Sequence, residues 1–173
     1  MSGTGKSTLG SALAKELGLL YVEGDELHPK SNVEKMSRGV PLTDGDREPW
    51  LDLIRTTAES GAKENGDGVV ITCSALKKSY RDILRGRRTG PAGAPSERGQ
   101  LATYFVWIDG SRALLEERLQ KRQGHFFKAS LLDSQLETLE SPQGEEGVIV
   151  VPLEADTEEQ ARTAAQTLRS FRQ

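Results

Sequence analysis

The sequence has a single cysteine, two histidines and few aromatic residues, which make up 5% of the chain. One thiol, Cys73, cannot form an internal disulfide, so a disulfide-stabilised scaffold is excluded and a reducing, cytoplasmic setting is expected. No apolar run approaches the roughly 20 residues that span a bilayer. The first residues also lack the apolar core of a secretory signal. We therefore expect no membrane partner.

The sequence also lacks a large excess of either charge, because 23 Lys and Arg nearly balance 26 Asp and Glu and leave a formal net charge of −3. This balance gives no reason to expect a nucleic-acid partner. The 173 residues fit a single domain, since one domain typically takes about 100–200 residues. We predict one domain over residues 1–173.

Two kinds of apolar segment alternate along the chain. Short runs, typical of strands buried on both faces, lie at 19–22, 69–73, 104–108 and 148–151. Amphipathic stretches typical of helices lie at 7–17, 47–61, 112–122 and 158–171, the last opening with Thr157 as a capping box. This alternation predicts an α/β fold with a parallel sheet covered by helices on both faces. The Gly- and Pro-rich segment from Gly86 to Gly99 is expected to be a flexible surface loop.

The amino end carries most of a phosphate-binding loop. Gly5, Lys6 and Ser7 match the end of the pattern G-x-x-x-x-G-K-[ST], and a predicted helix follows at once. Such a loop directs backbone amides at phosphate, its lysine reaches the β- and γ-phosphates, and its hydroxyl ligates Mg²⁺. The first glycine of the pattern would fall one residue before Met1. The alternative is a Gly- and Ser-rich terminus without function.

Asp25 and Arg47 are candidates for a site at the ends of the predicted strands. Asp25 lies just past a predicted strand end, where ligands gather in open α/β sheets, and the alternative is a turn or helix-cap carboxylate. Arg47 follows Asp44 and Gly45, which we interpret as turn residues rather than as part of a calcium loop.

Six basic residues crowd the segment after Cys73 against one acid, Asp82, which gives a local charge of +5. They are Lys77, Lys78, Arg81, Arg85, Arg87 and Arg88. A solvated helix face is the simplest interpretation, especially for the last three, and a nucleic-acid patch is the alternative. Lys77 and Arg81 lie four residues apart on one helix face and are our candidates for anion binding.

Arg118 and Arg122 also lie four residues apart on a predicted helix, and Gly124 and His125 follow them. A surface helix with paired charges is the alternative to a site. His28 and His125 have no ligand cluster around them, so neither predicts a metal site.

Beyond the amino end, five ordered stretches carry a family resemblance. They are Glu23–Pro29 (EGDELHP), Asn32–Met36 (NVEKM), Gly39–Leu51 (GVPLTDGDREPWL), Cys73–Asp82 (CSALKKSYRD) and Gly124–Phe127 (GHFF). Together with Ser2–Thr8, they closely resemble the gluconate kinases, small ATP-dependent sugar-acid kinases with the P-loop fold of the nucleoside-monophosphate kinases. The resemblance runs from Ser2 to about Leu139.

The resemblance implies that MgATP phosphorylates D-gluconate to 6-phosphogluconate, which enters the pentose phosphate pathway. The implied catalytic residues are Lys6, Asp25 and Arg122. The implied ATP-binding residues are Gly3, Thr4, Gly5, Lys6, Ser7, Thr8, Arg118 and Arg122, with Ser7 as the Mg²⁺ ligand. The implied gluconate-binding residues are Asp25, His28, Lys35, Arg47, Lys77, Arg81 and His125. A homodimer is kept as a hypothesis.

Relatives of this kind carry a mobile lid, expected here at about 118–139. Two departures from the family stand out. Glu23 lies where aspartate is more usual, and the first strand of the fold, central in its sheet, is missing ahead of the P-loop. Because a central strand supplies hydrogen bonds on both sides, we expect residues 1–173 alone to be unstable and to bind ATP poorly.

Two alternatives to a gluconate kinase remain at this point. One is a shikimate or nucleotide kinase of the same fold, against which the stretches at 39–51 and 73–82 speak. The other is a truncated, non-catalytic product.

Overall fold

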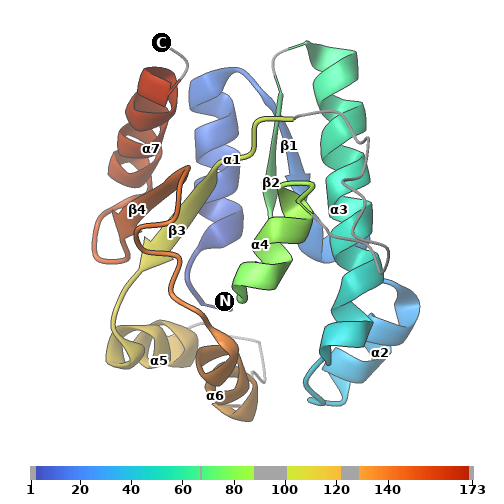
Figure 1. The fold of residues 1–173 in the computed structure, drawn as a ribbon. Coiled ribbons are helices and arrows are strands. Elements are labelled where there is room, and N and C mark those ends of the chain that lie inside the picture. The colour runs from blue at the N-terminus through green and yellow to red at the C-terminus, as the bar shows by residue number, and fades with distance from the viewer. Residues whose placement is uncertain (1–2, 67, 88–100, 122–128, 172–173) are drawn as a thin grey trace.

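A computed structural model describes residues 3–66, 68–87, 101–121 and 129–171. The strands are β1 (Leu20–Glu23), β2 (Val69–Thr72), β3 (Phe105–Asp109) and β4 (Val148–Pro152). The helices are α1 (Lys6–Leu17), the 3-10 helix η1 (Gly24–Leu27), α2 (Lys30–Ser37), α3 (Asp44–Asn65), α4 (Lys78–Leu84), α5 (Arg112–Lys121), α6 (Ala129–Thr138) and α7 (Thr157–Phe171). Strands and helices alternate as predicted, which confirms the α/β class (Figure 1).

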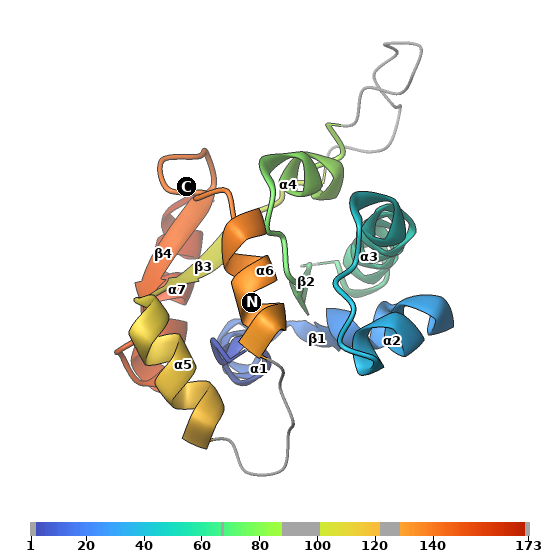
Figure 2. The same cartoon turned by 90° about the horizontal axis from the view of Figure 1, so that it is seen from below.

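The strands form two parallel pairs rather than one continuous sheet. β1 pairs with β2, with Leu20 opposite Val69, and β3 pairs with β4, with Phe105 opposite Val148. Within the described residues, no ladder joins β2 to β3. Seen from below, the two pairs lie to either side of α1 (Figure 2). That the central strand lies outside residues 1–173 stays a prediction.

Helix α1 packs against both halves of the molecule. Leu9 and Leu13, two members of its predicted apolar stripe, are buried, and the helix contacts β1, β2 and α7. Gly18 ends it in the left-handed conformation, with φ of 68°, and its amide bonds back to the last turn. The prediction of this helix and of its glycine stop is confirmed.

An apolar groove of about 800 Å³ separates the two pairs. Its walls include Val70 of β2, Val106 of β3, Leu13 of α1 and Ile54 of α3. Consequently Val69–Ile71 are only half-buried, whereas the sequence predicted a strand buried on both faces.

Two helix starts differ from the sequence prediction. α3 begins at Asp44, so Asp44 and Gly45 are helical rather than turn residues. Thr43 and Asp46 form a capping box there, in which Thr43 Oγ1 accepts from the amide of Asp46. The cap of α7 is Asp156, whose carboxylate accepts from the Glu159 amide at 2.8 Å, and not Thr157.

The predicted loop and lid lie partly outside the described residues. Only 86 and 87 of the loop at 86–99 are described. Of the lid predicted at about 118–139, the structure describes the last turn of α5 and the whole of α6, whereas residues 122–128 lie outside the described residues. None of the helices in the described ranges has the length and hydropathy needed to cross a membrane.

Candidate active site

The P-loop residues form the turn that starts α1. Gly3 and Gly5 have φ of 80° and 84°, a backbone conformation that favours glycine, and Gly5 is the N-cap. As the N-cap, Gly5 has no side chain with which to cap the first turn of α1, which is the arrangement that a phosphate-binding helix start uses. Thr4 is buried, whereas Ser7 and Thr8 are exposed. The structure thus places the start of α1 directly after the predicted P-loop residues, and their role in anion binding stays a prediction.

Gly3 also places the P-loop against α5. A Cβ atom at Gly3 would lie 2.8 Å from Cγ of Leu119. One residue earlier, Arg118 donates from Nη2 to the carbonyl O of Leu153 at 2.6 Å. Arg118 therefore lies on the helix that packs against the P-loop. Arg122 and His125, the other predicted lid residues, lie outside the described residues.

Glu23, at the end of β1, connects the P-loop helix to both strands of its pair. Its carboxylate accepts hydrogen bonds from the hydroxyls of Tyr21 and Thr72, and hydrogen bonding with the Ser7 hydroxyl also lowers its pKa. Burial works to raise the pKa of Glu23, but these hydrogen bonds outweigh it and hold the pKa below its ordinary value. Sequence reasoning noted Glu23 only as a departure from a family pattern. Its position directly after a strand was the available signal.

Asp25 lies exposed in η1, on a turn that neighbouring elements fix from two sides. Trp50 Nε1 donates to the carbonyl O of Gly24 at 2.7 Å, and the Gly24 amide donates to Thr72 Oγ1 at 3.4 Å. A Cβ atom at Gly24 would lie 2.0 Å from the carbonyl O of Thr72, so only glycine fits. The carboxylate of Asp25 is thereby presented at the end of β1.

His28 lies beside this turn. Its ring stacks on Trp50 with 4.0 Å between centroids and 15° between planes. Asn32 reaches His28 Nδ1 at 3.4 Å and donates to the carbonyl O of Asp46 at 2.7 Å. Burial, the largest effect, lowers the pKa of His28, and the charge of Arg47 adds to this against the opposing effect of Asp25. The imidazole is therefore neutral near pH 7.

Arg47, Asp44, Lys77 and Tyr80 form what we call the α3–α4 cluster. Lys77 Nζ donates to both carboxylate oxygens of Asp44, at 2.8 and 2.7 Å, and the Tyr80 hydroxyl donates to Asp44 Oδ1. The guanidinium carbon of Arg47 and Nζ of Lys77 lie 5.9 and 5.7 Å from the centroid of the Tyr80 ring. Arg47 is 9% exposed, and its buried Nε has no hydrogen-bond partner among the described residues. The cluster thus combines two cations with a buried donor that lacks an acceptor.

Lys35 lies next to the cluster but its ammonium already has a partner. It donates to Asp46, and this hydrogen bond, together with the Thr43 amide and hydroxyl, lowers the pKa of Asp46 to about 2. The predicted role of Lys35 in substrate binding therefore competes with its role at the start of α3.

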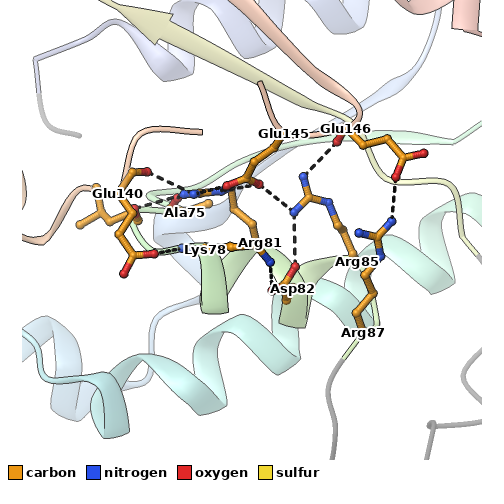
Figure 3. A network of polar contacts seen from close by, with 10 residues as sticks. Ala75, Lys78, Arg81, Asp82, Arg85, Arg87, Glu140, Glu145 and Glu146 are labelled. Carbon is orange, nitrogen blue, oxygen red and sulfur yellow. Dashed lines mark hydrogen bonds and ion pairs between the residues drawn. The ribbon is translucent and has the colours of Figure 1, made fainter. Parts of the chain in front are cut away.

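The hydrogen-bond partners of Arg81 argue against its predicted role in gluconate binding. Its side chain is 2% exposed and donates to Glu145 and to the carbonyl oxygens of Ala75, Leu76 and Glu140 (Figure 3). All its nitrogens are used, so it binds the segment before β4 and not an outside anion. The spacing of four residues predicted that Arg81 and Lys77 bind an anion together. The prediction fails for Arg81, because a buried guanidinium with this many acceptors has a structural role.

The basic segment is also less positive than its local sequence suggests. Arg85 is nearly buried, with 6% of its side chain exposed, and it pairs with Glu145 and Asp82. Arg87 pairs with Glu146 (Figure 3). The expectation of a solvated helix face is wrong for Arg85, because the chain folds so that Glu145, 60 positions away, pairs with its guanidinium. Arg88 lies outside the described residues.

Comparison with known proteins gives a consistent result. A family model described as "AAA domain" matches residues 1–142. The chain is 52% identical over 151 residues to a gluconokinase of Gluconobacter oxydans, covering 87% of this chain and 78% of that protein. It is 40% identical over 176 residues to the thermosensitive gluconokinase of Escherichia coli, covering 99% of this chain and 87% of that protein.

Solved structures agree with these relatives. The crystal structure of a gluconokinase from Sinorhizobium meliloti matches with a TM-score of 0.81 and 44% identity, covering 98% of this chain and 88% of that one. An unliganded sugar kinase from Janibacter sp. matches with a TM-score of 0.82 and 39% identity, covering 98% of this chain and 90% of that one. Both likenesses extend over nearly the whole described fold.

Proposed function

This chain belongs to the gluconokinase family, and from that premise we propose that it transfers the γ-phosphoryl group of ATP to D-gluconate. The observation that carries the proposal is the 40–52% identity to two gluconokinases over 87–99% of the chain. In the reaction, a gluconate hydroxyl oxygen forms a bond to the γ-phosphorus, and the bond from that phosphorus to the β–γ bridging oxygen breaks. The products are ADP, 6-phosphogluconate and a proton.

On the ATP side, we assign phosphate binding to the amides of residues 3–8 and to Lys6. The supporting geometry is the start of α1 directly after Gly3 and Gly5, whose positive φ suits a phosphate-binding turn. Arg118, on the helix that packs against Gly3, is assigned to the nucleotide as well. Arg122 remains a prediction for the same role.

For Mg²⁺, the Ser7 hydroxyl and the Glu23 carboxylate fit the ion, because both are oxygen donors and they interact next to the P-loop. They would hold it directly or through water, with phosphates and water completing its coordination. When bound, Mg²⁺ neutralises charge on the phosphate oxygens. Tyr21 and Thr72 keep the Glu23 carboxylate in place through their hydroxyls.

On the gluconate side, Asp25 orients the attacking hydroxyl and accepts its proton. This assignment is supported by the exposed carboxylate on a turn that Trp50 and Thr72 fix. Arg47 and Lys77 bind the substrate carboxylate, since two cations and an unpartnered guanidinium nitrogen meet there. His28 and Lys35 line the same region, His125 remains a prediction, and Arg81 is left out.

The product suggests a wider setting. 6-Phosphogluconate would feed the pentose phosphate pathway, and the free thiol of Cys73 suits the cytoplasm. We keep the homodimer as a hypothesis. The two relatives described above are gluconokinases, so they favour neither a shikimate or nucleotide kinase nor a non-catalytic product.

The test is a coupled ADP-release assay on residues 1–173 with MgATP and a panel of acceptors. We expect release with D-gluconate and little with shikimate or nucleoside monophosphates. Because the chain alone is expected to be unstable, the assay is repeated with a chain that carries a short apolar strand fused ahead of residue 1. Absence of any preference for gluconate in both chains would overturn the proposal.

A further inference from the structure

Asp44 lies where the proposed site would receive a carboxylate from outside. Lys77 Nζ donates to both of its oxygens, the Tyr80 hydroxyl donates to one of them, and the charge of Arg47 acts on it as well. The side chain of Asp44 therefore offers the cluster the same chemical group that an aldonic acid offers. An internal carboxylate and the substrate carboxylate compete for the same ammonium.

The exposure of these groups makes an exchange feasible. The side chain of Asp44 is 65% exposed and that of Lys77 is 28% exposed, so water reaches the ion pair from the Asp44 side. Ion pairs of this kind are weak and readily broken. Arg47 differs, because its Nε is buried and finds no acceptor in the part of the chain that the structure describes, so Asp44 does not satisfy it. A ligand that reaches both Lys77 and Arg47 makes a contact that Asp44 does not make.

We propose that Asp44 is an internal competitor whose carboxylate occupies Lys77 in the free protein and is displaced by the carboxylate of gluconate. The inference rests on the proposed function. No covalent bond changes in the exchange, since one carboxylate replaces another at the same ammonium. The displaced Asp44 stays at the start of α3, where the helix N-terminus favours its negative charge.

The competition sets the affinity and selectivity of the site. Every carboxylate ligand must displace Asp44, and its affinity is reduced by the strength of the contacts that Asp44 makes with Lys77 and Tyr80. A neutral polyol of the same length has no group that needs Lys77, so its affinity is independent of Asp44. Asp44 is therefore a residue that tunes specificity without taking part in phosphoryl transfer.

The test is calorimetric titration of the chain with D-gluconate and with D-glucitol, which carries a hydroxymethyl group in place of the carboxylate. Asp44→Asn should bind gluconate about two- to five-fold more tightly than the parent chain. Its binding of glucitol should not change. Glu16→Gln is the matched control, because Glu16 pairs with Arg169 of α7 by a similarly exposed contact away from the cluster.

A double-mutant cycle separates competition from a general effect on the fold. In a Lys77→Met background, Asp44→Asn should give no further gain in gluconate affinity. Asp44→Ser replaces Asp44→Asn if the thermal melt shows that the amide variant does not fold. Unchanged or weaker gluconate binding by a folded Asp44 variant, or an equal gain in the Lys77→Met background, would overturn the inference. Failure of the parent chain to bind gluconate, with and without the fused strand, would instead overturn the proposed function.

Discussion

Trp50 Nε1 donates a hydrogen bond to the carbonyl O of Gly24 at 2.7 Å, although the two residues are 26 positions apart. The indole of Trp50, which belongs to α3, is fully buried in the hydrophobic core. Gly24 starts the turn that carries Asp25. A side chain on Gly24 would collide with the carbonyl O of Thr72, so the turn lies directly against β2. The position of Asp25 therefore depends on the packing of α3 against the β1–β2 pair.

Replacing Trp50 by phenylalanine tests this dependence. The change leaves the Gly24 carbonyl without its buried donor, which costs about 1–3 kcal/mol of stability, and it frees the turn under Asp25. We expect a lower Tm and a kcat at least about 5-fold lower. Trp107→Phe in β3, measured in the same way by thermal melt and ADP release, should lower Tm with little loss of kcat. Equal losses of kcat in both variants would contradict the link.

Arg47→Ala should act on substrate binding. Hydrogen bonds to charged groups contribute about 1.5–3 kcal/mol, so we expect the KM for gluconate to rise about 10-fold or more while the KM for ATP changes little. Arg47→Lys should recover only part of the loss, since lysine lacks the planar fork. Arg162→Ala, on the exposed face of α7, is the control. If Arg47→Ala leaves the KM for gluconate unchanged, Arg47 has no place in the substrate site.

The ion pair of Arg81 with Glu145 predicts a pH dependence of stability. The Arg81 hydrogen bond, aided by Arg85 against the effect of burial, holds the pKa of Glu145 below its ordinary value of 4.5. A lowered pKa in the folded state means that the stabilisation is complete above pH 4.5 and is lost as the pH falls through the folded-state pKa. Glu145→Gln should therefore lower Tm at pH 7 and flatten the fall of Tm between about pH 5 and 3. Parallel Tm curves for the two proteins would contradict this account.

Features set by neighbouring residues could be predicted from the sequence. The stripe of Leu9 and Leu13 with Gly18 predicted α1, because helical period and a glycine stop are local signals. The capping box of Thr43 and Asp46 was also local, but the Asp-Gly-Asp stretch was interpreted as a turn and α3 was started too late.

Contacts between distant segments could not be predicted in this way. Arg81 and Glu145 are 64 positions apart, so the sequence showed a basic helix where the structure has a buried network. Glu23 was likewise undervalued, because its partners Ser7 and Thr72 come from other elements that only the fold brings together. The chemistry of Lys6 and Asp25 was suggested by motif, whereas the neighbourhood of each required coordinates.

The groove between β2 and β3 predicts weak stability for residues 1–173 alone. Each strand pairs on one side only within the described ranges, and apolar side chains line the gap. A fused strand of about five apolar residues that ends in glycine should raise Tm by about 10 °C or more and strengthen MgATP binding. A Gly- and Ser-rich segment of equal length is the control. A cooperative melt of the unextended chain in the ordinary mesophilic range, with micromolar ATP affinity, would contradict the prediction.

The most direct measurement follows labelled phosphorus from [γ-³²P]ATP in the presence of Mg²⁺ and D-gluconate, with the products separated by chromatography. The chain, with the fused strand if needed, should form labelled 6-phosphogluconate. Lys6→Ala should lower the rate at least about 100-fold, because its cation stabilises charge on the transferred group, while Lys15→Ala on the exposed side of α1 should not. Label recovered only as inorganic phosphate, or equal rates for Lys6→Ala and the parent chain, would contradict the account.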